Sequence, residues 1–371
     1  MLFPGNPGLL LRGSLRRGRL VLARRGLGRT WPNPAVGCVI VNAGRIVGRG
    51  WTQVGGRPHA EVVALVQAGK RANGATAYVT LEPCAHHGQT PPCSEALIEA
   101  GIARVVAAME DSDPRVSGRG FAQLRGAGVV VETGICAKDA AESNAGFFLK
   151  TEVGRPFVTL KLALSLDGRI ATLTGDSQWI TGSEARRAVH AMRATHDAVL
   201  IGAGTARGDD PSLTVRGLGI GHQPVRVVAA QSLKIDLESS LAKTARDVPV
   251  WLCHGSDVKD EDRAAWIDLG AELIACETDA SGLEPHQMMQ ALGHKGLTRV
   301  FCEGGGHLAA SLLRADLVDR LVIHSAGVAI GGDGLAGLAS MGHDVLADAA
   351  RFRLASHRQL GVDIEHIWQR A

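Results

Sequence analysis

The chain has 371 residues, of which 45% are hydrophobic and 21% are charged; at this length, such a composition suggests two ordinary globular domains. The formal net charge of +3 is too small to indicate a polyanionic partner, and no apolar run approaches the length of a membrane span. Seven cysteines, an odd number spread along the sequence, favour a reducing cytoplasm over a disulfide framework.

The first 30 residues hold seven arginines and no acidic residue. This composition is compatible with a transit peptide or a basic arm that touches nucleic acid, but we interpret it as a short extension followed by an amphipathic helix over residues 20–25. Apolar runs and turn residues then predict strands at 36–41, 45–51, 75–81, 104–109 and 129–131. Helical spacing predicts helices at 60–70, 94–100, 121–125 and 137–150. This alternation predicts a layered α/β domain over residues 1–150.

A break at Gly154, Arg155 and Pro156 separates this domain from a second α/β series, which we place at residues 155–371. Its predicted strands lie at 157–164, 198–202, 225–229, 249–253, 272–275, 299–302 and 321–324. Its predicted helices lie at 183–193, 261–269, 285–292 and 306–314.

Two short segments of the first domain combine the residue types of a hydrolytic zinc site. His59 and Glu61 are two positions apart, and Pro83-Cys84 is followed by Cys93 nine positions after Cys84. One imidazole and two thiolates leave the fourth tetrahedral position of Zn²⁺ open, which distinguishes catalytic from structural zinc sites. His59 and Cys93 are expected to open helices, whose N-termini favour thiolates. Glu61 can then face an activated water without binding the metal, as in zinc deaminases.

The loop between the two cysteines leaves one alternative open and raises one further point. His86 or His87 could complete a structural zinc site, which would leave no position for a reacting water. The loop at residues 85–92 has eight residues, whereas nucleotide deaminases usually have two between these cysteines. The longer loop predicts a substrate of a different shape.

Glycines in the second domain give a weaker indication of a nucleotide site. Gly202 and Gly204 follow a predicted strand, but Arg207 occupies the position at which a dinucleotide-binding fingerprint has its third glycine. Three glycines at 304–306 follow the strand at 299–302 and begin a helix, so free backbone N–H groups there could hold a diphosphate. A simple strand-to-helix turn explains the same glycines equally well.

Seven segments carry a resemblance that covers most of the chain. They are PNPAVGC at 32–38, PHAE at 58–61, TLEPCAHHGQTPPC at 80–93 and the segments at 161–169, 177–181, 208–216 and 303–305. They closely resemble the bifunctional pyrimidine deaminase–reductases of riboflavin biosynthesis. The resemblance implies a cytidine-deaminase-like three-layer domain followed by a dihydrofolate-reductase-like α/β domain, with Zn²⁺ and NADPH as cofactors. The implied reactions are deamination of a diaminopyrimidinone ribosylamino 5′-phosphate and reduction of its ribosyl group to ribityl.

The same resemblance implies roles for individual residues. In the first domain they are the zinc ligands His59, Cys84 and Cys93, the proton carrier Glu61, the pyrimidine-reading Asn33, and Asp111 and Asp113 in a loop near the substrate. The residues implied to line the NADPH site are Ala163, Trp179, Thr205, Asp209, Gly305, Gly306, His307, Leu308, Ala309, Ala310 and Ser311. Those implied to contact the substrate are Ser177, Arg193, Leu213, Arg216 and Glu303. From the residues alone, Asn33 is equally well a turn residue between two prolines, whereas Arg193 and Arg216 suit a ribose phosphate.

Three positions depart from the family pattern. The Arg-rich stretch at 11–21 lacks the acidic residues that members usually have there, and Gln89 stands where members often have a basic residue. Ala229-Ala230 stands where members often have Asp-Ser. This last departure leaves open a deaminase whose second domain binds a ligand without reducing it.

Two further alternatives are a nucleic-acid base deaminase and a non-enzymatic zinc-stabilised binding module. The former would need aromatic side chains interleaved with the basic ones to stack bases, and the chain lacks that pattern. We therefore predict a cytoplasmic enzyme that acts on a small pyrimidine ribosyl phosphate and binds neither nucleic acid nor membrane. A homodimer or higher homo-oligomer is implied by the resemblance alone.

Overall fold

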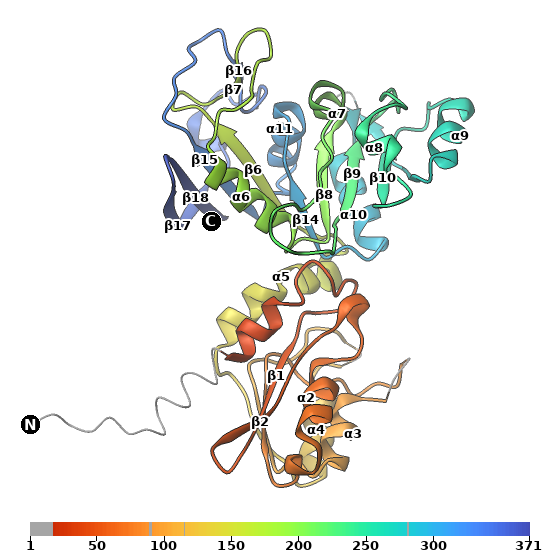
Figure 1. The fold of residues 1–371 in the computed structure, drawn as a ribbon, viewed down its shortest axis with the longest axis vertical. Coiled ribbons are helices and arrows are strands. Elements are labelled where there is room, and N and C mark those ends of the chain that lie inside the picture. The colour runs from red at the N-terminus through yellow and green to blue at the C-terminus, as the bar shows by residue number, and fades with distance from the viewer. Residues whose placement is uncertain (1–17, 89–90, 115, 280–281) are drawn as a thin grey trace, which may run out of the picture. The chain divides into compact units, whose positions relative to one another are not determined.

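The computed structural model describes residues 18–88, 91–114, 116–279 and 282–371 (Figure 1). The chain divides between Gly154 and Arg155 into two compact units. The predictions made for residues 11–17 and for Gln89 lie outside the described residues.

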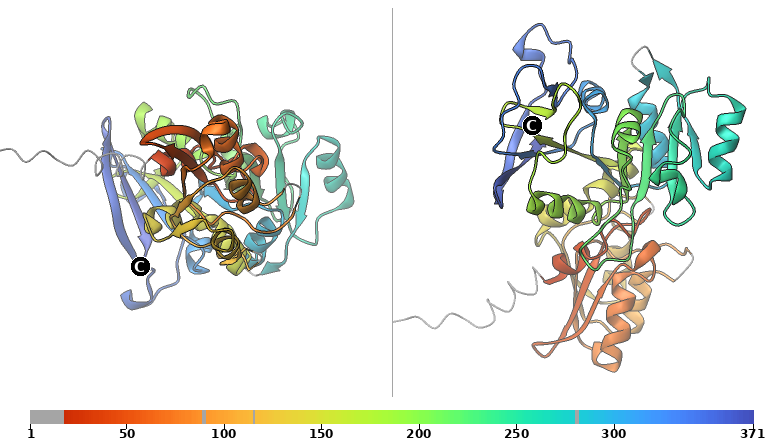
Figure 2. Two further views of the ribbon diagram at one scale, coloured as in Figure 1. Left: turned by 90° about the horizontal axis from the view of Figure 1, so that it is seen from below. Right: turned by 45° about the horizontal axis from the view of Figure 1, so that its top comes forward.

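The first unit is built on a five-stranded sheet in the order β2-β1-β3-β4-β5. Its strands are β1 (Gly37–Asn42), β2 (Arg45–Trp51), β3 (Thr76–Val79), β4 (Arg104–Ala107) and β5 (Val130–Glu132). Its helices are a first helix at residues 18–24, α2 (Ala60–Ala68), α3 (Cys93–Glu99), α4 (Arg119–Gly126) and α5 (Ala137–Val153). Helix α3 contacts α2 and α4. Leu20 of the first helix packs with Ala140 of α5, and the ribbons show this red helix beside the yellow α5 (Figure 1 and Figure 2). This three-layer arrangement confirms the predicted cytidine-deaminase-like fold.

Two glycines let helix α2 lie directly against strand β2. A Cβ atom on Gly48 would stand 2.2 Å from the Ala64 carbonyl oxygen, and one on Gly50 would stand 2.1 Å from the Ala60 carbonyl oxygen. Neither gap admits a side chain, so both positions require glycine. This close packing fixes the start of α2, which carries the predicted zinc site.

A buried arginine ties the first helix to the sheet. Arg19 has no exposed surface, and its guanidinium donates hydrogen bonds to the carbonyl oxygens of Val79 at 2.8 Å, Val106 at 2.6 Å and Ile135 at 2.6 Å. Val79 and Val106 lie at the carboxyl ends of β3 and β4, and Ile135 lies three residues after β5. This member of the Arg-rich segment therefore serves the fold, and the helix at 18–24 overlaps the amphipathic helix predicted at 20–25.

The second unit is built on a nine-stranded sheet in the order β11-β10-β9-β8-β14-β6-β15-β18-β17. Its strands are β6 (Phe157–Leu164), β8 (Ala198–Gly202), β9 (Val225–Ala229), β10 (Val250–His254), β11 (Glu272–Ala275), β14 (Arg299–Cys302), β15 (Arg320–Ser325), β17 (Phe352–Leu360) and β18 (Asp363–Arg370). Two small sheets pair β7 (Arg169–Ala171) with β16 (Leu335–Ala336) and β12 (Thr278–Asp279) with β13 (Gly282–Leu283). The helices are α6 (Ser183–Arg193), α7 (Ala203–Asp209), α8 (Ser240–Lys243), α9 (Asp260–Asp268), α10 (Pro285–His294) and α11 (Gly306–Arg314).

The sheet of the second unit is parallel from β11 to β15 and ends in an antiparallel hairpin of β17 and β18. Its seven predicted strands lie within one residue of the observed bounds. The prediction missed this hairpin, because most residues of β17 are exposed and carry no apolar pattern. It also missed α7, in which Gly204 and Gly208 lower the helix propensity of the segment.

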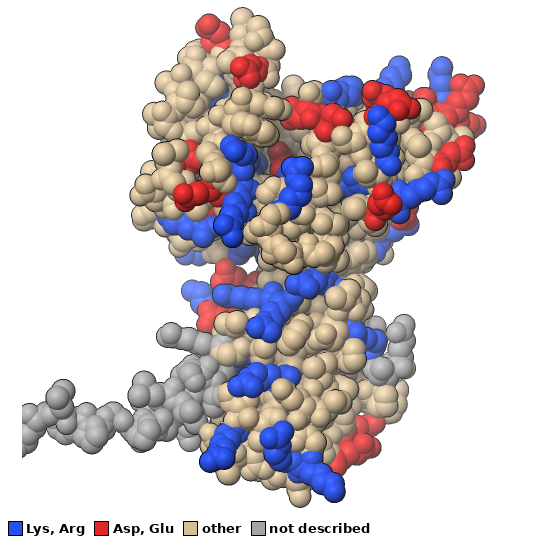
Figure 3. All heavy atoms as spheres, viewed as in Figure 1, with Lys and Arg blue, Asp and Glu red and all other residues tan. Residues whose placement is uncertain are grey.

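Surface charge is spread over both units. On the face seen in Figure 3, Lys and Arg side chains are distributed along the first unit and alternate with Asp and Glu on the second. None of the described helices combines the length and the apolar character that a membrane crossing needs.

The C-terminal hairpin carries a buried charged group. Glu365 of β18 is 2% exposed, and its carboxylate accepts a hydrogen bond from Arg358 Nε at 2.6 Å and lies 3.1 Å from His324 Nε2. Burial alone would raise the pKa of Glu365. The hydrogen bonds from His324 and Arg358 outweigh burial and lower that pKa from its usual 4.5 to about 2.

We expect the Glu365 carboxylate to make stability depend on pH. Because its pKa is lower in the folded chain than in the unfolded chain, its contribution is fully present above pH 4.5 and is lost as the pH falls towards 2. The full shift corresponds to about 3 kcal/mol. E365Q should therefore unfold at a lower urea concentration than the wild type at pH 7. The difference between the two urea midpoints should become smaller at about pH 3.5. A difference that is the same at both pH values would contradict this expectation.

Candidate functional site

Three side chains that could hold a metal ion meet at the starts of α2 and α3. His59 caps the N-terminus of α2, Cys93 is the first residue of α3, and Cys84 lies in the loop before α3. His59 Nδ1 lies 3.3 Å from Cys93 Sγ and 3.5 Å from Cys84 Sγ, and the three ligand atoms lie within 4.8 Å of one another. Tetrahedral Zn²⁺, with bonds of about 2.0 Å to nitrogen and about 2.3 Å to sulfur, would hold such atoms about 3.5 Å apart. The group therefore fits zinc.

The two cysteines of this group differ in acidity. Cys84 accepts a hydrogen bond from the Cys93 thiol and, at 3.3 Å, from the Cys93 backbone N–H. The Cys93 thiol is the largest cause that lowers the pKa of Cys84 to about 4. Because the thiolate is the form that binds metal, Cys84 is already prepared as a ligand.

Glu61 lies beside the ligands as the second residue of α2. Its side chain is 3% exposed, and burial raises the pKa of its carboxyl group. It also forms a side-chain hydrogen bond with Cys93. A raised pKa makes a carboxylate a better proton acceptor, and its protonated form can return the proton. Glu61 is therefore the candidate general acid and base.

The predicted alternative ligands stand apart from this group. Among the described residues, the group of candidate ligand atoms within 4.8 Å contains His59 and the two cysteines, and neither His86 nor His87. His87 instead lies 3.3 Å from the Glu95 carboxylate. This arrangement favours an open fourth position over a structural site.

A buried carboxylate that the sequence prediction missed holds the next loop beside the cysteines. Glu82 is 3% exposed and accepts hydrogen bonds from the backbone N–H groups of Asp111 at 3.2 Å, Gly118 at 3.0 Å and Phe121 at 3.1 Å. Burial raises the pKa of Asp111 to about 6. The signal available in the sequence was an acidic residue within the motif that also carries Cys84.

Asn33 lies in a turn near the start of the metal-binding segment. Its backbone N–H donates to the Thr30 carbonyl at 2.9 Å. Its side chain packs on Gly56, where a Cβ atom would stand 2.0 Å from Asn33 Nδ2. The turn interpretation therefore holds, and the same position puts the amide next to the segment that leads into His59.

The second unit contains a cavity of about 1260 Å³ at the carboxyl ends of β6, β8, β9 and β14. Ligands of open α/β sheets bind at this edge. The predicted residues among its lining are Ala163, Ser177, Trp179, Arg193, Thr205, Asp209, Leu213, Arg216, Glu303, Gly305, Gly306, His307, Leu308 and Ser311. Ala309 and Ala310 are fully buried in α11 and do not line the cavity, because the helix turns them into the core.

A buried ion pair lies on the wall of this cavity. Arg193 of α6 donates to both carboxylate oxygens of Glu303, from Nε at 2.5 Å and from Nη2 at 2.9 Å, and to the Thr214 carbonyl at 2.9 Å. Burial opposes ionisation of Glu303, but Arg193 outweighs it and lowers the pKa of the carboxyl group. The three Arg193 nitrogens are thus turned towards protein acceptors. Arg216, which is exposed, is the better placed of the two arginines for a substrate phosphate.

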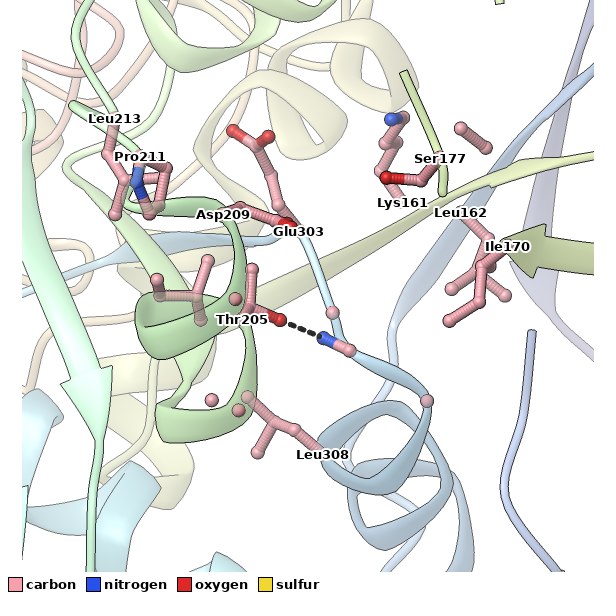
Figure 4. Close-up of a pocket in the computed structure, with 18 of the residues that line it drawn as sticks. Lys161, Leu162, Ile170, Ser177, Thr205, Asp209, Pro211, Leu213, Glu303 and Leu308 are labelled. Atoms are coloured by element: carbon pink, nitrogen blue, oxygen red, sulfur yellow. Dashed lines mark hydrogen bonds between the residues drawn. The ribbon is translucent and has the colours of Figure 1, made fainter. Parts of the chain in front are cut away.

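The prediction assigned no role to Lys161, although it lines the same cavity. Figure 4 shows Lys161 and Ser177 on one side of Glu303, with Pro211 and Leu213 on the other. Burial lowers the pKa of the Lys161 ammonium, and Glu303 opposes that effect. The signal in the sequence was a lysine inside the apolar strand β6.

The glycines at 304–306 lie at the middle of the cavity wall. The Gly305 N–H donates to Thr205 Oγ1 at 3.1 Å, which joins the start of α11 to α7 (Figure 4). Backbone N–H groups at the start of a helix suit a diphosphate. The cavity exceeds the usual range of about 300–1,000 Å³ for small-ligand sites, so it fits a dinucleotide together with a second molecule.

Two family models match the chain. The model described as cytidine and deoxycytidylate deaminase zinc-binding region matches residues 18–109, and the model described as RibD C-terminal domain matches residues 156–365. The riboflavin biosynthesis protein RibD of Escherichia coli is 42% identical over 355 residues, which cover 93% of this chain and 95% of that protein. RibD of Aquifex aeolicus is 38% identical, and the matched region covers 95% of this chain and 96% of that protein.

Solved structures agree with this relationship. Acinetobacter baumannii RibD has a TM-score of 0.87 at 37% identity, covering 98% of this chain and 100% of that chain. The diaminohydroxyphosphoribosylaminopyrimidine deaminase/5-amino-6-(5-phosphoribosylamino)uracil reductase of Thermotoga maritima has a TM-score of 0.84 at 31% identity, covering 98% and 99%. A metal-binding first unit and a reductase-type second unit thus occur in one chain, as they do in these relatives. The chain belongs to the RibD family, the bifunctional zinc-dependent deaminases and NADPH-dependent reductases of riboflavin biosynthesis.

Proposed function

We propose that residues 1–150 form the deaminase domain and residues 155–371 the reductase domain. The first would remove the 2-amino group of 2,5-diamino-6-ribosylamino-4(3H)-pyrimidinone 5′-phosphate. The second would reduce the ribosyl group of that product and yield 5-amino-6-ribitylaminouracil 5′-phosphate. The observation that carries this proposal is the grouping of His59, Cys84 and Cys93 beside the buried Glu61.

In the deaminase half, His59, Cys84 and Cys93 would hold zinc, which when bound supplies a Lewis acid that activates water. Glu61 would accept one proton from the attacking water and deliver it to the ring nitrogen. It would then move the second proton, from the resulting hydroxyl group, to the amine, which departs as ammonia. Its burial supports this role, because burial raises the pKa of its carboxyl group and so favours uptake of a proton. Asn33 would read the pyrimidine, and Asp111 would lie near it.

In the reductase half, NADPH when bound would supply the hydride. The start of α11 and Thr205 would hold its diphosphate, and the substrate would lie by Ser177, Lys161 and Glu303. Arg193 would fix the Glu303 carboxylate, and Arg216 would contact the ribose phosphate. The remaining NADPH contacts would come from the cavity-lining residues that the family resemblance implied.

The proposal also covers the location of the enzyme, its use of nucleic acid and its oligomeric state. We infer a cytoplasmic enzyme that does not use nucleic acid, which the small formal net charge of +3 supports. We also infer a homodimer or higher homo-oligomer. Sedimentation of the purified chain, with and without added nucleic acid, tests both inferences about partners.

Product mass spectrometry tests the proposed function. The ribosylamino pyrimidinone phosphate is incubated with the enzyme, with and without NADPH. Without NADPH, we expect exchange of one amine for oxygen alone; with NADPH, we expect two added hydrogens as well. Exchange without added hydrogens under both conditions would favour a non-reducing second domain, with Ala229-Ala230 as the first residues to restore. No exchange under either condition would contradict the deaminase assignment.

A further inference from the structure

The cavity of the second unit has two chemically different ends. Lys161 and Ser177 line the end near β6, whereas Ala229, Gln231 and Ser240 line the end near β9. In the sheet, β8 and β14 stand between β9 and β6. The cavity therefore extends across four neighbouring strands, along which an extended dinucleotide can lie.

The site for the diphosphate, in the middle of the cavity, determines which half of such a dinucleotide lies at each end. Gly305, which follows β14, joins Thr205 of α7 at this point, and the backbone N–H groups of the residues that follow it, at the start of α11, suit a diphosphate. Under the proposed function, the reacting nicotinamide lies with the substrate near Lys161 and Glu303. The adenosine half must then extend to the other side, over the carboxyl ends of β8 and β9.

Strand β9 brings no acidic side chain to this end of the cavity, where the carboxylates are Asp209 and Asp210 at the end of α7. NAD-specific enzymes place an acidic side chain at the 2′-hydroxyl of the adenosine ribose. Here β9 ends in Ala229. Asp210 is already engaged, since its carboxylate accepts from Ser240 N at 2.7 Å and from Ser240 Oγ at 2.8 Å.

One cationic side chain reaches this end. Among the described lining residues, the Lys and Arg side chains are Lys161, Arg186, Arg193, Arg207 and Arg216. Arg207 is the member of this set that belongs to α7, between the diphosphate site and β9. Its guanidinium is exposed and donates from Nη1 to the Lys234 carbonyl at 3.3 Å. A guanidinium has five N–H donors, so this contact leaves capacity for an anion.

We propose that Arg207 binds the 2′-phosphate of NADPH and thereby makes the reductase prefer NADPH over NADH. This inference rests on the proposed reductase function. It explains why an arginine stands at the position where a dinucleotide-binding fingerprint has a glycine. A glycine there would permit closer helix packing, whereas the arginine supplies a charge that the phosphate needs.

Binding measurements test the proposal without reference to catalysis. Isothermal titration of the wild type and of R207Q should use three probes: NADP⁺, NAD⁺ and adenosine 2′,5′-bisphosphate. We expect R207Q to weaken NADP⁺ and the bisphosphate by about tenfold or more, because a hydrogen-bonded charge pair is lost. The affinity for NAD⁺ should stay within about twofold of that of the wild type. R207K, which keeps the charge, should recover part of the NADP⁺ affinity.

Matched controls separate the possible failures. Arg263 of α9 pairs with Asp260 on the surface and does not line the cavity, so R263Q should bind all three probes as the wild type does. Equal losses for NADP⁺ and NAD⁺ in R207Q would place Arg207 on the shared diphosphate and overturn the proposal. Unchanged NADP⁺ affinity would also overturn it while leaving the reductase assignment intact. A wild type that binds neither dinucleotide would overturn the proposed reductase itself.

Discussion

Substitution of Glu61 by glutamine should stop deamination while zinc stays bound. Glutamine keeps the shape of the side chain but cannot accept a proton, and general acid–base catalysis contributes about 10²–10⁴-fold to such reactions. We expect amine release to fall by about a thousandfold. The three candidate ligands are unchanged in E61Q, so the metal content measured by atomic emission should match that of the wild type.

Two comparisons make the E61Q result interpretable. Glu99 is an exposed glutamate of α3, and E99Q should deaminate normally. When E61Q is supplied with the deaminated intermediate, it should oxidise NADPH at the wild-type rate, because Glu61 belongs to the first unit and the second unit is unaltered. Full deamination by E61Q would instead remove Glu61 from the proposed proton transfer.

Replacement of Glu303 by glutamine should have the largest effect on the reductase half. Arg193 donates two hydrogen bonds to this carboxylate, and the group lies between Lys161 and Leu213 in the cavity (Figure 4). Loss of one charge from a buried pair typically lowers the free energy of unfolding by about 3–5 kcal/mol, because the partner stays charged and is left without its counter-ion. We expect kcat/KM for reduction of the deaminated intermediate to fall at least about a hundredfold, with amine release unchanged.

A surface pair provides the control for E303Q. Glu238 and Lys243 form an exposed ion pair, in which Glu238 is 81% exposed, so E238Q should reduce the intermediate at the wild-type rate. Thermal unfolding of E303Q distinguishes a local loss of activity from a collapse of the second unit. A stable E303Q variant with normal reduction would remove Glu303 from the proposed site.

Local sequence patterns were sufficient for the metal site and for most of the second sheet. His59, Cys84 and Cys93 stand at the starts of helices or just before one, so short spacings brought them together without knowledge of the fold. Strands β9 and β14 lie within their predicted bounds because parallel strands buried on both faces are almost wholly apolar. The exposed strand β17 has no such pattern and could not be recognised.

Contacts between distant residues could not be predicted from those patterns. Arg193 and Glu303 are 110 positions apart, and nothing in the helix that carries Arg193 distinguishes a solvated arginine from a buried one. The family resemblance named both residues as substrate contacts, but the structure pairs them with each other. Glu82 and Lys161 were missed for the same reason, because their partners lie on other elements.

The Arg19 contacts also bear on how the chain folds as it is made. Ile135, the last of the three carbonyls that Arg19 holds, follows it by 116 positions. At about 5–20 residues per second, a ribosome takes roughly 6–23 seconds to add those positions. The first helix therefore leaves the ribosome before β3, β4 and β5, yet it can take its final place only after β5 has followed. Slow translation between Arg19 and Ile135 would prolong the time during which the carbonyl groups that Arg19 binds are exposed to other molecules.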